Sequence, residues 1–245
     1  MHRIAYITDL HLNEDFTAAQ GTDPIKNWNR IVADLQKRNI DRIVFGGDIG
    51  SIASTEWMVD ALMRTGKPFH ITPGNHDSSK EILKYYNPGE NFPSGKMYGN
   101  IFIENKICIF LDSSTDAVDD EQLQWLRKIL QGNTSAIIFI HHPVVQIPVM
   151  VDQLYPLMNR DEVKEIMMRS ASQIHLFSGH YHFNHEPSDG NIHQVVTMAS
   201  SCQIGDDGAQ LTIDPSIFGY RIIELHDDEV TSEVIEFARD AAEMH

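Results

Sequence analysis

The sequence is poor in several features that mark particular classes of protein. Only two of its 245 residues are cysteines, Cys108 and Cys202, and both lie in apolar, strand-like segments. This argues against a disulfide-rich secreted scaffold and predicts two buried thiols. No apolar run approaches the roughly 18 residues that a membrane-spanning helix needs. Met1 leads almost directly into the strand-like segment 3–8, without the charged and apolar regions of a signal peptide. We therefore expect a cytoplasmic protein without membrane contact.

Basic residues are also scarce. The chain has 19 Lys and Arg against 35 Asp and Glu, which gives a formal net charge of −16. Such a surface repels a polyanion, so we expect no nucleic-acid polymer as a partner. A small anionic substrate would need local positive charge, which bound metal ions supply. The 13 histidines are numerous for this length, and their positions therefore decide much of the interpretation.

Short apolar runs alternate with amphipathic segments along the chain, and no internal repeat or Gly/Ser linker divides it. We expect strands at 3–8, 42–46, 68–72, 97–104, 106–113, 136–140 and 174–178 and in the tail from about 191. We expect helices at 24–39, 54–66, 119–130 and about 160–170. The alternation predicts the α/β class, while the hairpin at 97–113 and the strand-rich tail exclude a purely parallel sheet. One domain over residues 1–245 fits best, with two mixed sheets packed face to face and helices outside.

Polar residues of the types that bind metal follow five of the expected strands. These residues are Asp9 and His11, then Asp48, then Asn75, His76 and Asp77, then His141 and His142, and finally His180 and His182. In α/β folds, binding sites form outside the carboxyl ends of the strands. Any one of these clusters alone is a common turn or cap pattern, but all five at strand ends predict a shared site.

The mixture of imidazole and carboxylate indicates the chemistry of that site. It suits transition ions such as Mn, Fe, Zn or Co better than Ca²⁺ or thiolate-bound Zn²⁺. A shared carboxylate can bridge two such ions, an arrangement that clamps the oxygens of a phosphoryl displacement. In Asp9-x-His11 and His180-x-His182, residues two apart point to the same side of an extended chain. The sequence therefore favours a centre of two divalent or mixed-valence transition-metal ions.

At this point the sequence resembles a known family. The motifs Asp9-x-His11, Gly47-Asp48, Gly74-Asn75-His76-Asp77, His141 and Gly179-His180-x-His182 are similar to the complete signature of the calcineurin-like metallophosphoesterases. The motifs occur in order over the first three quarters of the chain. The resemblance implies a four-layer α/β/β/α sandwich of two mixed β-sheets flanked by helices, with a di-metal site.

The resemblance also implies roles for individual residues. One metal would be bound by Asp9, His11, Asp48 and His182, and the other by Asp48, Asn75, His141 and His180, with Asp48 bridging. His142 stays a lesser candidate ligand. A water between the ions would lose its proton near neutral pH and attack phosphorus in line. His76 would contact the phosphate and protonate the leaving oxygen, and Asp77 would orient the His76 ring.

Two longer segments, 141–167 and 196–225, resemble the corresponding regions of bacterial class III cyclic-nucleotide phosphodiesterases. Two departures stand out: residues 49–54 lack the acidic residue common in that group, and His142-Pro143 is followed by Val rather than a second proline. The favoured activity is hydrolysis of small phosphodiesters, with 3′,5′-cyclic nucleotides as the leading substrate.

Other interpretations remain open at this level. A phosphomonoesterase or nucleotide pyrophosphatase would use the same metal centre. A nuclease fits the net charge less well, and a non-catalytic binding module would be expected to have lost ligands. His70, His175 and His193 lie inside strand-like runs and are read as core or surface residues rather than ligands. By resemblance, a homodimer is expected.

Overall fold

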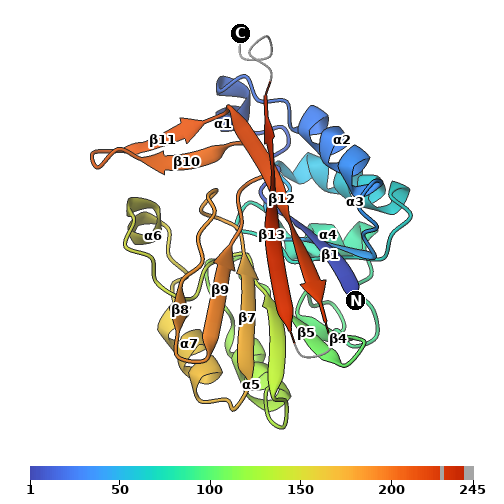
Figure 1. Ribbon diagram of the computed structural model, residues 1–245, viewed down its shortest axis with the longest axis vertical. Coiled ribbons are helices and arrows are strands. Elements are labelled where there is room, and N and C mark those ends of the chain that lie inside the picture. Colours follow the sequence, from blue (N-terminus) through green and yellow to red (C-terminus); the bar gives the residue numbers. More distant parts are fainter. Residues whose placement is uncertain (227–228, 240–245) are drawn as a thin grey trace.

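The computed structural model describes residues 1–226 and 229–239 and contains two large mixed sheets (Figure 1). The first sheet has the strand order β13-β12-β1-β2-β3. Its strands are β1 (His2–Ile7), β2 (Arg42–Phe45), β3 (Phe69–Ile71), β12 (Ile217–Leu225) and β13 (Val230–Ala238). The first three run parallel, and β12 pairs antiparallel with both β1 and β13. The first and last parts of the chain thus share one sheet.

The second sheet has the order β4-β5-β6-β7-β9-β8. Its strands are β4 (Gly99–Ile103), β5 (Lys106–Phe110), β6 (Ser135–Phe139), β7 (Gln173–Ser178), β8 (Ser188–Asp189) and β9 (Ile192–Val196). The four central strands β5, β6, β7 and β9 are parallel, and β4 and β8 pair antiparallel at the two edges. The predicted hairpin at 97–113 is confirmed as the pair β4–β5.

The two sheets pack face to face through an apolar layer to which both contribute. Tyr6 of the first sheet stacks on Phe139 of the second, with ring centroids 5.7 Å apart. Phe139 in turn stacks on Phe110 and Phe177. These rings are almost completely buried, and aromatic stacking adds to the free energy gained by burial. Cys108 lies in the same layer, and both it and Cys202 are buried free thiols, as predicted.

Helices cover the outer faces of both sheets, so that the layers follow the order α/β/β/α. The helices are α1 (Asp15–Ala19), α2 (Pro24–Leu35), α3 (Thr55–Arg64), α4 (Ser79–Tyr85), α5 (Asp120–Ile129), α6 (Met150–Leu154) and α7 (Arg160–Met168), with a 3₁₀ turn at Ile52–Ser54. α2, α3 and α4 bury apolar side chains against the first sheet, and α5 and α7 against the second. The predicted architecture is confirmed.

Local signals explain where the predicted helices begin and end. α2 begins where Asp23 accepts a hydrogen bond from the backbone N–H of Lys26, with Pro24 at the first helical position. It ends at Leu35, earlier than predicted, and Asn39 then adopts a positive φ of 49°. Asn tolerates this conformation better than most residues, which favours a chain reversal there. None of the helices in the described residues combines the length and the apolar composition that spanning a membrane requires.

Two features near one end of the sandwich were not predicted from the sequence. The helix α6 is short, and the strands β10 (Gln203–Asp206) and β11 (Leu211–Asp214) form a separate two-stranded sheet. In Figure 1 this hairpin projects away from the large sheets, with α6 below it. Both features border the site described in the next subsection.

His70 lies in β3 among aromatic rings, as the sequence analysis expected for a core residue. Its ring centroid is 4.8 Å from that of Phe110 and 5.8 Å from that of Phe92. Burial in this apolar layer lowers the pKa of His70 from 6.5 to about 4, although its hydrogen bond to the Phe69 carbonyl opposes the shift.

This shift predicts a dependence of stability on pH. The unfolded chain binds more protons than the folded protein below pH 6.5, so the contribution of neutral His70 is complete above that pH and is lost toward pH 4. The full loss is roughly 3 kcal/mol. We expect His70→Phe to flatten the decline in unfolding free energy over this window, measured by urea denaturation at a series of pH values. Parallel pH profiles for the variant and the wild type would contradict this account of His70.

Candidate metal centre

Five residues that were predicted as metal ligands share an unusual backbone conformation. Asp9, His11, Asp48, His180 and His182 have φ values of 58°, 50°, 55°, 70° and 52°. Residues with a Cβ rarely adopt this region, and the strain persists only where surrounding contacts hold it. Such contacts are present, because the carbonyl of Asp48 accepts hydrogen bonds from the N–H groups of Leu10 and His11 at 3.0 Å. The sharp turns after β1, β2 and β7 therefore aim these side chains at one point.

Two glycines allow the backbone to approach the buried carboxylates. A Cβ at Gly74 would lie 2.1 Å from Oδ1 of Asp48, and one at Gly179 would lie 2.4 Å from Oδ2 of Asp9. Both distances are far inside van der Waals contact, so any larger residue would displace the carboxylate. In place of side chains, the backbone N–H groups of His76 and His180 donate to Asp48 and Asp9.

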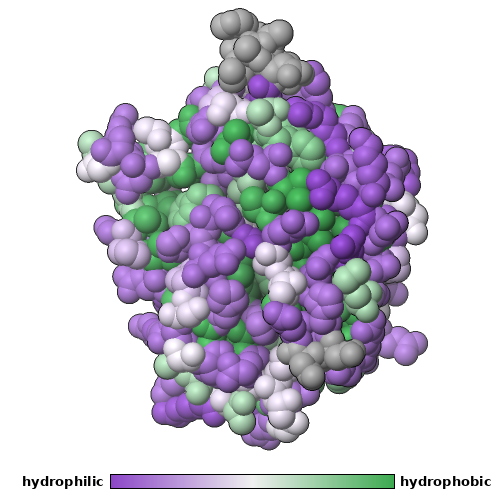
Figure 2. Space-filling view, in the orientation of Figure 1, coloured by the Kyte–Doolittle hydropathy of each residue, from purple (hydrophilic) through white to green (hydrophobic). Residues whose placement is uncertain are grey.

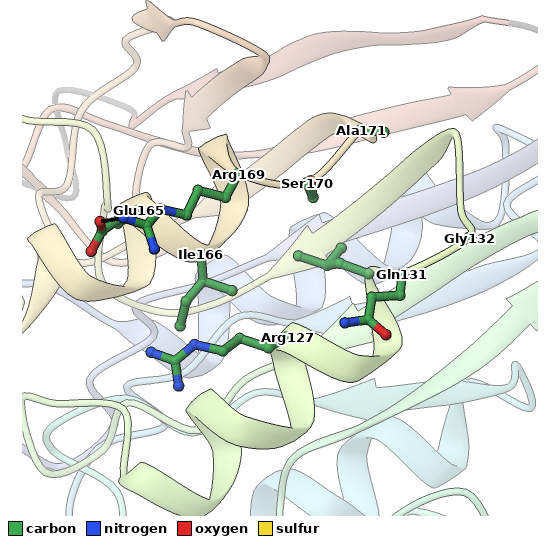
Figure 3. A pocket seen from close by; sticks show the side chains of 9 residues that line it. Arg127, Gln131, Gly132, Glu165, Ile166, Arg169, Ser170 and Ala171 are labelled. Atoms are coloured by element: carbon green, nitrogen blue, oxygen red, sulfur yellow. Dashed lines mark ion pairs between the residues drawn. The ribbon is translucent and has the colours of Figure 1, made fainter.

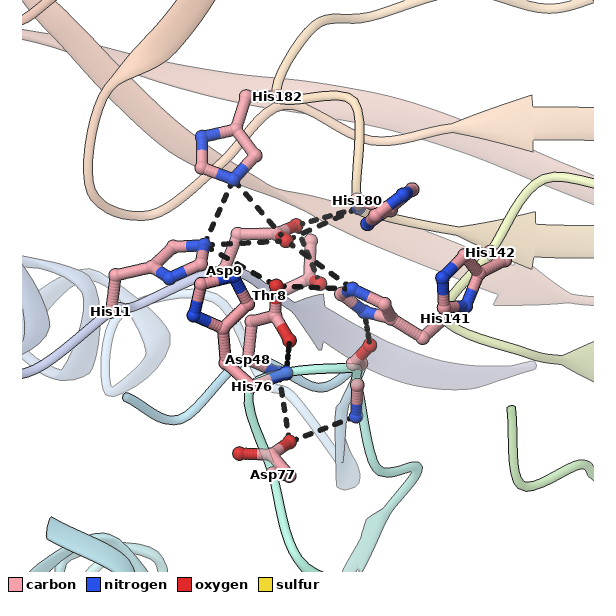
Figure 4. Close-up of polar contacts among 12 residues, drawn as sticks. Thr8, Asp9, His11, Asp48, His76, Asp77, His141, His142, His180 and His182 are labelled. Carbon is pink, nitrogen blue, oxygen red and sulfur yellow. Dashed lines mark hydrogen bonds and ion pairs between the residues drawn. The ribbon is translucent and has the colours of Figure 1, made fainter. Parts of the chain in front are cut away.

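The structure brings residues from all five strand ends to the junction of the two sheets (Figure 4). Potential ligand atoms cluster in three overlapping groups: Asp9, His11 and His182; His11, Asp48 and His76; and Asp48, His141 and His180. Oδ2 of Asp48 lies 3.4 Å from Nε2 of His11 and 3.2 Å from Nε2 of His141. Asp48 thus stands between the two predicted ligand sets, as a bridging carboxylate must.

Oδ1 of Asn75, a buried atom at this junction, has no hydrogen-bond partner. Nε2 of His141 makes no well-formed hydrogen bond either, and it faces the carboxylate oxygens of Asp48 at 3.2 Å and Asp9 at 3.8 Å. An unpaired buried polar atom is costly, and native proteins rarely contain one without a reason. Both atoms are electron-pair donors from residues predicted to bind the same ion. The residues present therefore fit a metal centre.

In three of the imidazoles that were predicted as ligands, the ring nitrogen that points away from the centre donates a hydrogen bond to a backbone carbonyl. His141 donates from Nδ1 to the Gly46 carbonyl at 2.8 Å, and His182 donates from Nδ1 to the Cys202 carbonyl at 2.8 Å. His180 donates from Nε2 to the Tyr155 carbonyl at 3.0 Å. Such bonds fix the ring orientation and leave the other nitrogen as an electron-pair donor, the usual arrangement around protein-bound metals.

The buried carboxylates Asp9 and Asp48 are strongly stabilised by positive charge nearby. Burial alone would raise the pKa of Asp9, but the neighbouring His182 overcomes this effect and lowers it to about 2. Burial alone would lower the pKa of His141, but Asp48 overcomes this effect and raises it to about 9. Both shifts express the same attraction between buried opposite charges. Divalent ions would compensate the negative charge of these carboxylates more fully than protons on the imidazoles do.

The expectation that Asp77 orients the His76 ring is wrong in this structure. The Asp77 carboxylate accepts three backbone hydrogen bonds instead, from Asp48 at 2.9 Å, Ile49 at 2.9 Å and Gly74 at 2.8 Å. These amides belong to the loops that follow β2 and β3. Asp77 therefore joins the loop that carries Asp48 to the loop that carries Asn75 and His76.

The carboxylate beside His76 belongs to Glu14, which the sequence analysis did not single out. Oε1 of Glu14 lies 2.9 Å from Nδ1 of His76, and Oε2 lies 3.0 Å from Nδ1 of His11. Glu14 stands three positions after His11, a spacing that brings side chains together across a turn, and this was the available signal. His142 lies outside the three ligand groups; its ring packs 4.1 Å from that of His180 and its Nδ1 contacts the Ser113 hydroxyl at 2.9 Å.

A pocket of about 340 Å³ opens over these residues. Its floor contains His11, Asp48, Asn75, His76, His180 and His182, and its wall contains Phe16, Val151, Tyr155, Ile204, Leu211 and Ile213. The wall comes largely from α6 and the β10–β11 hairpin, and Figure 2 shows apolar surface gathered beneath that hairpin. Among the described residues that line this pocket, none is Lys or Arg.

A larger hollow, of about 430 Å³, lies between α5 and α7 (Figure 3). Its charged side chains pair with neighbouring residues, Arg127 with Glu162 and Arg169 with Glu165. None of the three groups of potential metal ligands lies there. The smaller pocket, which contains members of all three groups, is therefore the candidate functional site.

Comparisons with known proteins agree with this geometry. The family model described as "Calcineurin-like phosphoesterase" matches residues 2–184. A probable cyclic nucleotide phosphodiesterase of Fibrobacter succinogenes is 25% identical over 241 residues, covering 95% of this chain and 93% of that protein. The 3′,5′-cyclic adenosine monophosphate phosphodiesterase CpdA of Haemophilus influenzae is 26% identical over 242 residues, covering 92% and 86% of the two chains. A dimetal phosphatase from Danio rerio has the same fold, with a TM-score of 0.63 at 14% identity over 97% of this chain and 98% of that one.

The position of Asp48 predicts its effect on metal content. We expect Asp48→Ala to lose nearly all of the bound metal, because both ligand sets contain this carboxylate, whereas His76→Ala keeps about two ions per chain. Elemental analysis after Mn²⁺ loading and gel filtration measures this. Full metal content in Asp48→Ala would refute the bridging role.

The contacts of Asp77 predict a structural role that is separable from that of its neighbour. Asp77→Ala leaves three buried amides unpaired and should lower the unfolding free energy of the metal-free protein by about 2–4 kcal/mol. His76→Ala, one residue earlier and exposed, should leave that free energy nearly unchanged. Chemical denaturation in the presence of EDTA compares the two variants. Equal stability would show that the Asp77 contacts do not support the loops.

Proposed function

This chain belongs to the calcineurin-like phosphoesterase family and is a phosphoester hydrolase; we propose that it hydrolyses small phosphodiesters, with 3′,5′-cyclic nucleotides as the leading substrate. The observation that carries the proposal is a cluster of buried side chains that can bind metal, which lies beneath an apolar, uncharged pocket wall.

The family generally uses a dinuclear metal centre, and the donors of this chain suit one. We assign Asp9, His11, Asp48 and His182 to one ion and Asp48, Asn75, His141 and His180 to the other, with Mn, Fe, Zn or Co as the candidate metals. When bound, the ions would supply positive charge for the phosphate oxygens and lower the pKa of water, so that a nucleophile is available near neutral pH. Asp9 and Asp48 bring only two negative charges, so a pocket with two divalent ions remains attractive to an anion.

His76 is suited to protonate the leaving oxygen. Its side chain is 41% exposed and lines the pocket, while the candidate ligand imidazoles are buried more deeply. The Glu14 carboxylate accepts the Nδ1 proton, which leaves Nε2–H free to face a substrate. The hydrogen bond from Glu14 also raises the pKa of His76, which favours the protonated ring that an acid catalyst needs.

The wall of the pocket favours one phosphate attached to an uncharged organic group. Phe16, Tyr155 and Ile213 offer apolar contact, and the described lining includes no cation for a second phosphate. A nucleobase presents a flat aromatic face that packs against such side chains. The net charge of −16 further disfavours polyanions.

A phosphomonoesterase or nucleotide pyrophosphatase on the same centre is the alternative activity. The wall argues against it, since a monoester or pyrophosphate brings extra negative charge that no described cation in the pocket meets. A non-catalytic binding module is a poorer fit, because the side chains that a metal centre needs lie close together beside His76. The homodimer and the cytoplasmic location stay predictions.

The test is a substrate panel with metal-depleted protein reconstituted with Mn²⁺. We expect bis-p-nitrophenyl phosphate to be hydrolysed about tenfold or more faster than p-nitrophenyl phosphate, since one apolar contact changes specificity by about 10- to 200-fold. Among natural classes, cyclic mononucleotides should exceed glycerophosphodiesters, dinucleotides and nucleoside monophosphates in kcat/KM. A preference for monoesters would overturn the diesterase proposal, and no turnover with any divalent metal would favour the binding module.

A further inference from the structure

Glu14 occupies a helix-capping position but does not cap the helix. It is the residue before α1, with an extended backbone (φ −108°, ψ 143°), and its side chain makes no capping hydrogen bond. An acidic side chain at this position usually accepts a hydrogen bond from the first turn of the helix. The carboxylate of Glu14 turns instead toward the two imidazoles of the pocket.

The two oxygens of Glu14 bind two rings with different tasks. Oε2 accepts from Nδ1 of His11, whose other nitrogen lies 3.4 Å from Asp48 in the metal centre. Oε1 accepts from Nδ1 of His76, the exposed residue that we assign as the acid. The two ring centroids are 4.8 Å apart and the ring planes are nearly perpendicular, at 88°. Glu14 is therefore the direct link between a metal ligand and the proton donor.

The backbone that carries Glu14 is held firmly. The buried hydroxyl of Thr17 contacts the carbonyl of His11 at 3.1 Å and that of Glu14 at 2.9 Å. The Glu14 side chain is only 13% exposed. A carboxylate fixed in this way loses little further conformational freedom when it orients a ring, and this is what makes positioning effective.

The other imidazoles of the centre lack such a link. His141, His180 and His182 donate their far N–H groups to backbone carbonyls, so none of these bonds leads to the proposed acid His76. Among the described residues, only Glu14 makes a side-chain hydrogen bond to the His76 ring.

We propose that Glu14 is a positioning residue that couples the metal centre to the leaving-group acid, by orienting His11 with one carboxylate oxygen and His76 with the other. The part that concerns His76 rests on the proposed function, whereas the part that concerns His11 does not. Without Glu14, the partly exposed His76 ring can turn away from the leaving oxygen, and His11 loses the bond that sets its tautomer.

Three variants test this proposal: Glu14→Ala removes both bonds, Glu14→Gln keeps one oxygen as an acceptor, and Asp15→Asn is the control. Asp15 is the adjacent, exposed acid, so its variant changes the charge near the site without touching either ring. Far-UV circular dichroism and denaturation of each variant verify that the fold is retained.

The kinetic readout is a series of methyl aryl phosphodiesters whose leaving phenols differ in pKa, so that the test does not depend on cyclic nucleotides being the substrate. We expect Glu14→Ala to slow kcat by about 10- to 100-fold for poor leaving groups, and much less for p-nitrophenol, which departs without a proton. His76→Ala should show the same pattern. At metal concentrations that saturate every variant, the Glu14→Ala/His76→Ala double variant should be no slower than His76→Ala alone. Glu14→Gln should recover part of the loss, and Asp15→Asn should match the wild type.

The second readout is Zn²⁺ affinity, measured by competition with a chelating dye and independent of turnover. We expect Glu14→Ala to weaken one site by about tenfold or more through His11, and His76→Ala to leave the affinity unchanged. Equal slowing for all leaving groups, or additive losses in the double variant, would overturn the link to His76. Unchanged Zn²⁺ affinity in Glu14→Ala would overturn the link to His11. Failure of the wild type to cleave any diester would instead count against the proposed function, and the affinity measurement would still decide the role of Glu14 toward His11.

Discussion

The burial of two carboxylates, Asp9 and Asp48, where the two sheets meet is the constraint on which the rest of the site depends. Like charges that are removed from water repel each other and cost several kcal/mol unless hydrogen bonds and opposite charge compensate. Backbone N–H groups from the two neighbouring loops supply the hydrogen bonds, at His76 for Asp48 and at His180 for Asp9. The surrounding imidazoles supply part of the charge, which the raised pKa of His141 and the lowered pKa of Asp9 both express. The buried amide oxygen of Asn75 also lies at this junction without a hydrogen-bond donor.

The same constraint explains the strained backbone. Two carboxylates and four imidazoles can converge only if the chain turns sharply after each strand, and five of these residues accept a positive φ to do so. Gly74 and Gly179 keep the space that the carboxylates fill. Asp77 then ties the loops after β2 and β3 together through three amides. The backbone strain at Asp48 is thus offset by hydrogen bonds that Asp77 makes to the loop that carries this predicted ligand.

Around this rigid floor, the parts that meet a substrate come from less regular segments. His76 is exposed, and the apolar wall belongs to α6 and the β10–β11 hairpin rather than to the large sheets. This division suits a hydrolase whose chemistry is fixed and whose specificity is adjustable, because loops tolerate changes that a strand end does not. Glu14 joins the two parts, with one oxygen on the buried His11 and the other on the exposed His76.

The sequence by itself determined the layered α/β class, the five strand-end clusters and residue types that suit a two-metal centre. These properties are local: hydrophobic runs define the strands, and the residues after each strand lie at its carboxyl end wherever the strand is placed. Helix boundaries were less exact, as at Leu35, because tertiary contacts and single residues such as Asn39 set them. Only the tertiary structure decided which carboxylate serves His76, because Asp77 is adjacent in sequence but turns to backbone amides, while Glu14 arrives from 62 residues away. The tertiary structure also decided which residues form the apolar wall of the pocket, since α6 and the β10–β11 hairpin reach the pocket from distant parts of the chain. Side-chain orientation in loops depends on such long-range contacts, and no local pattern of residues contains them.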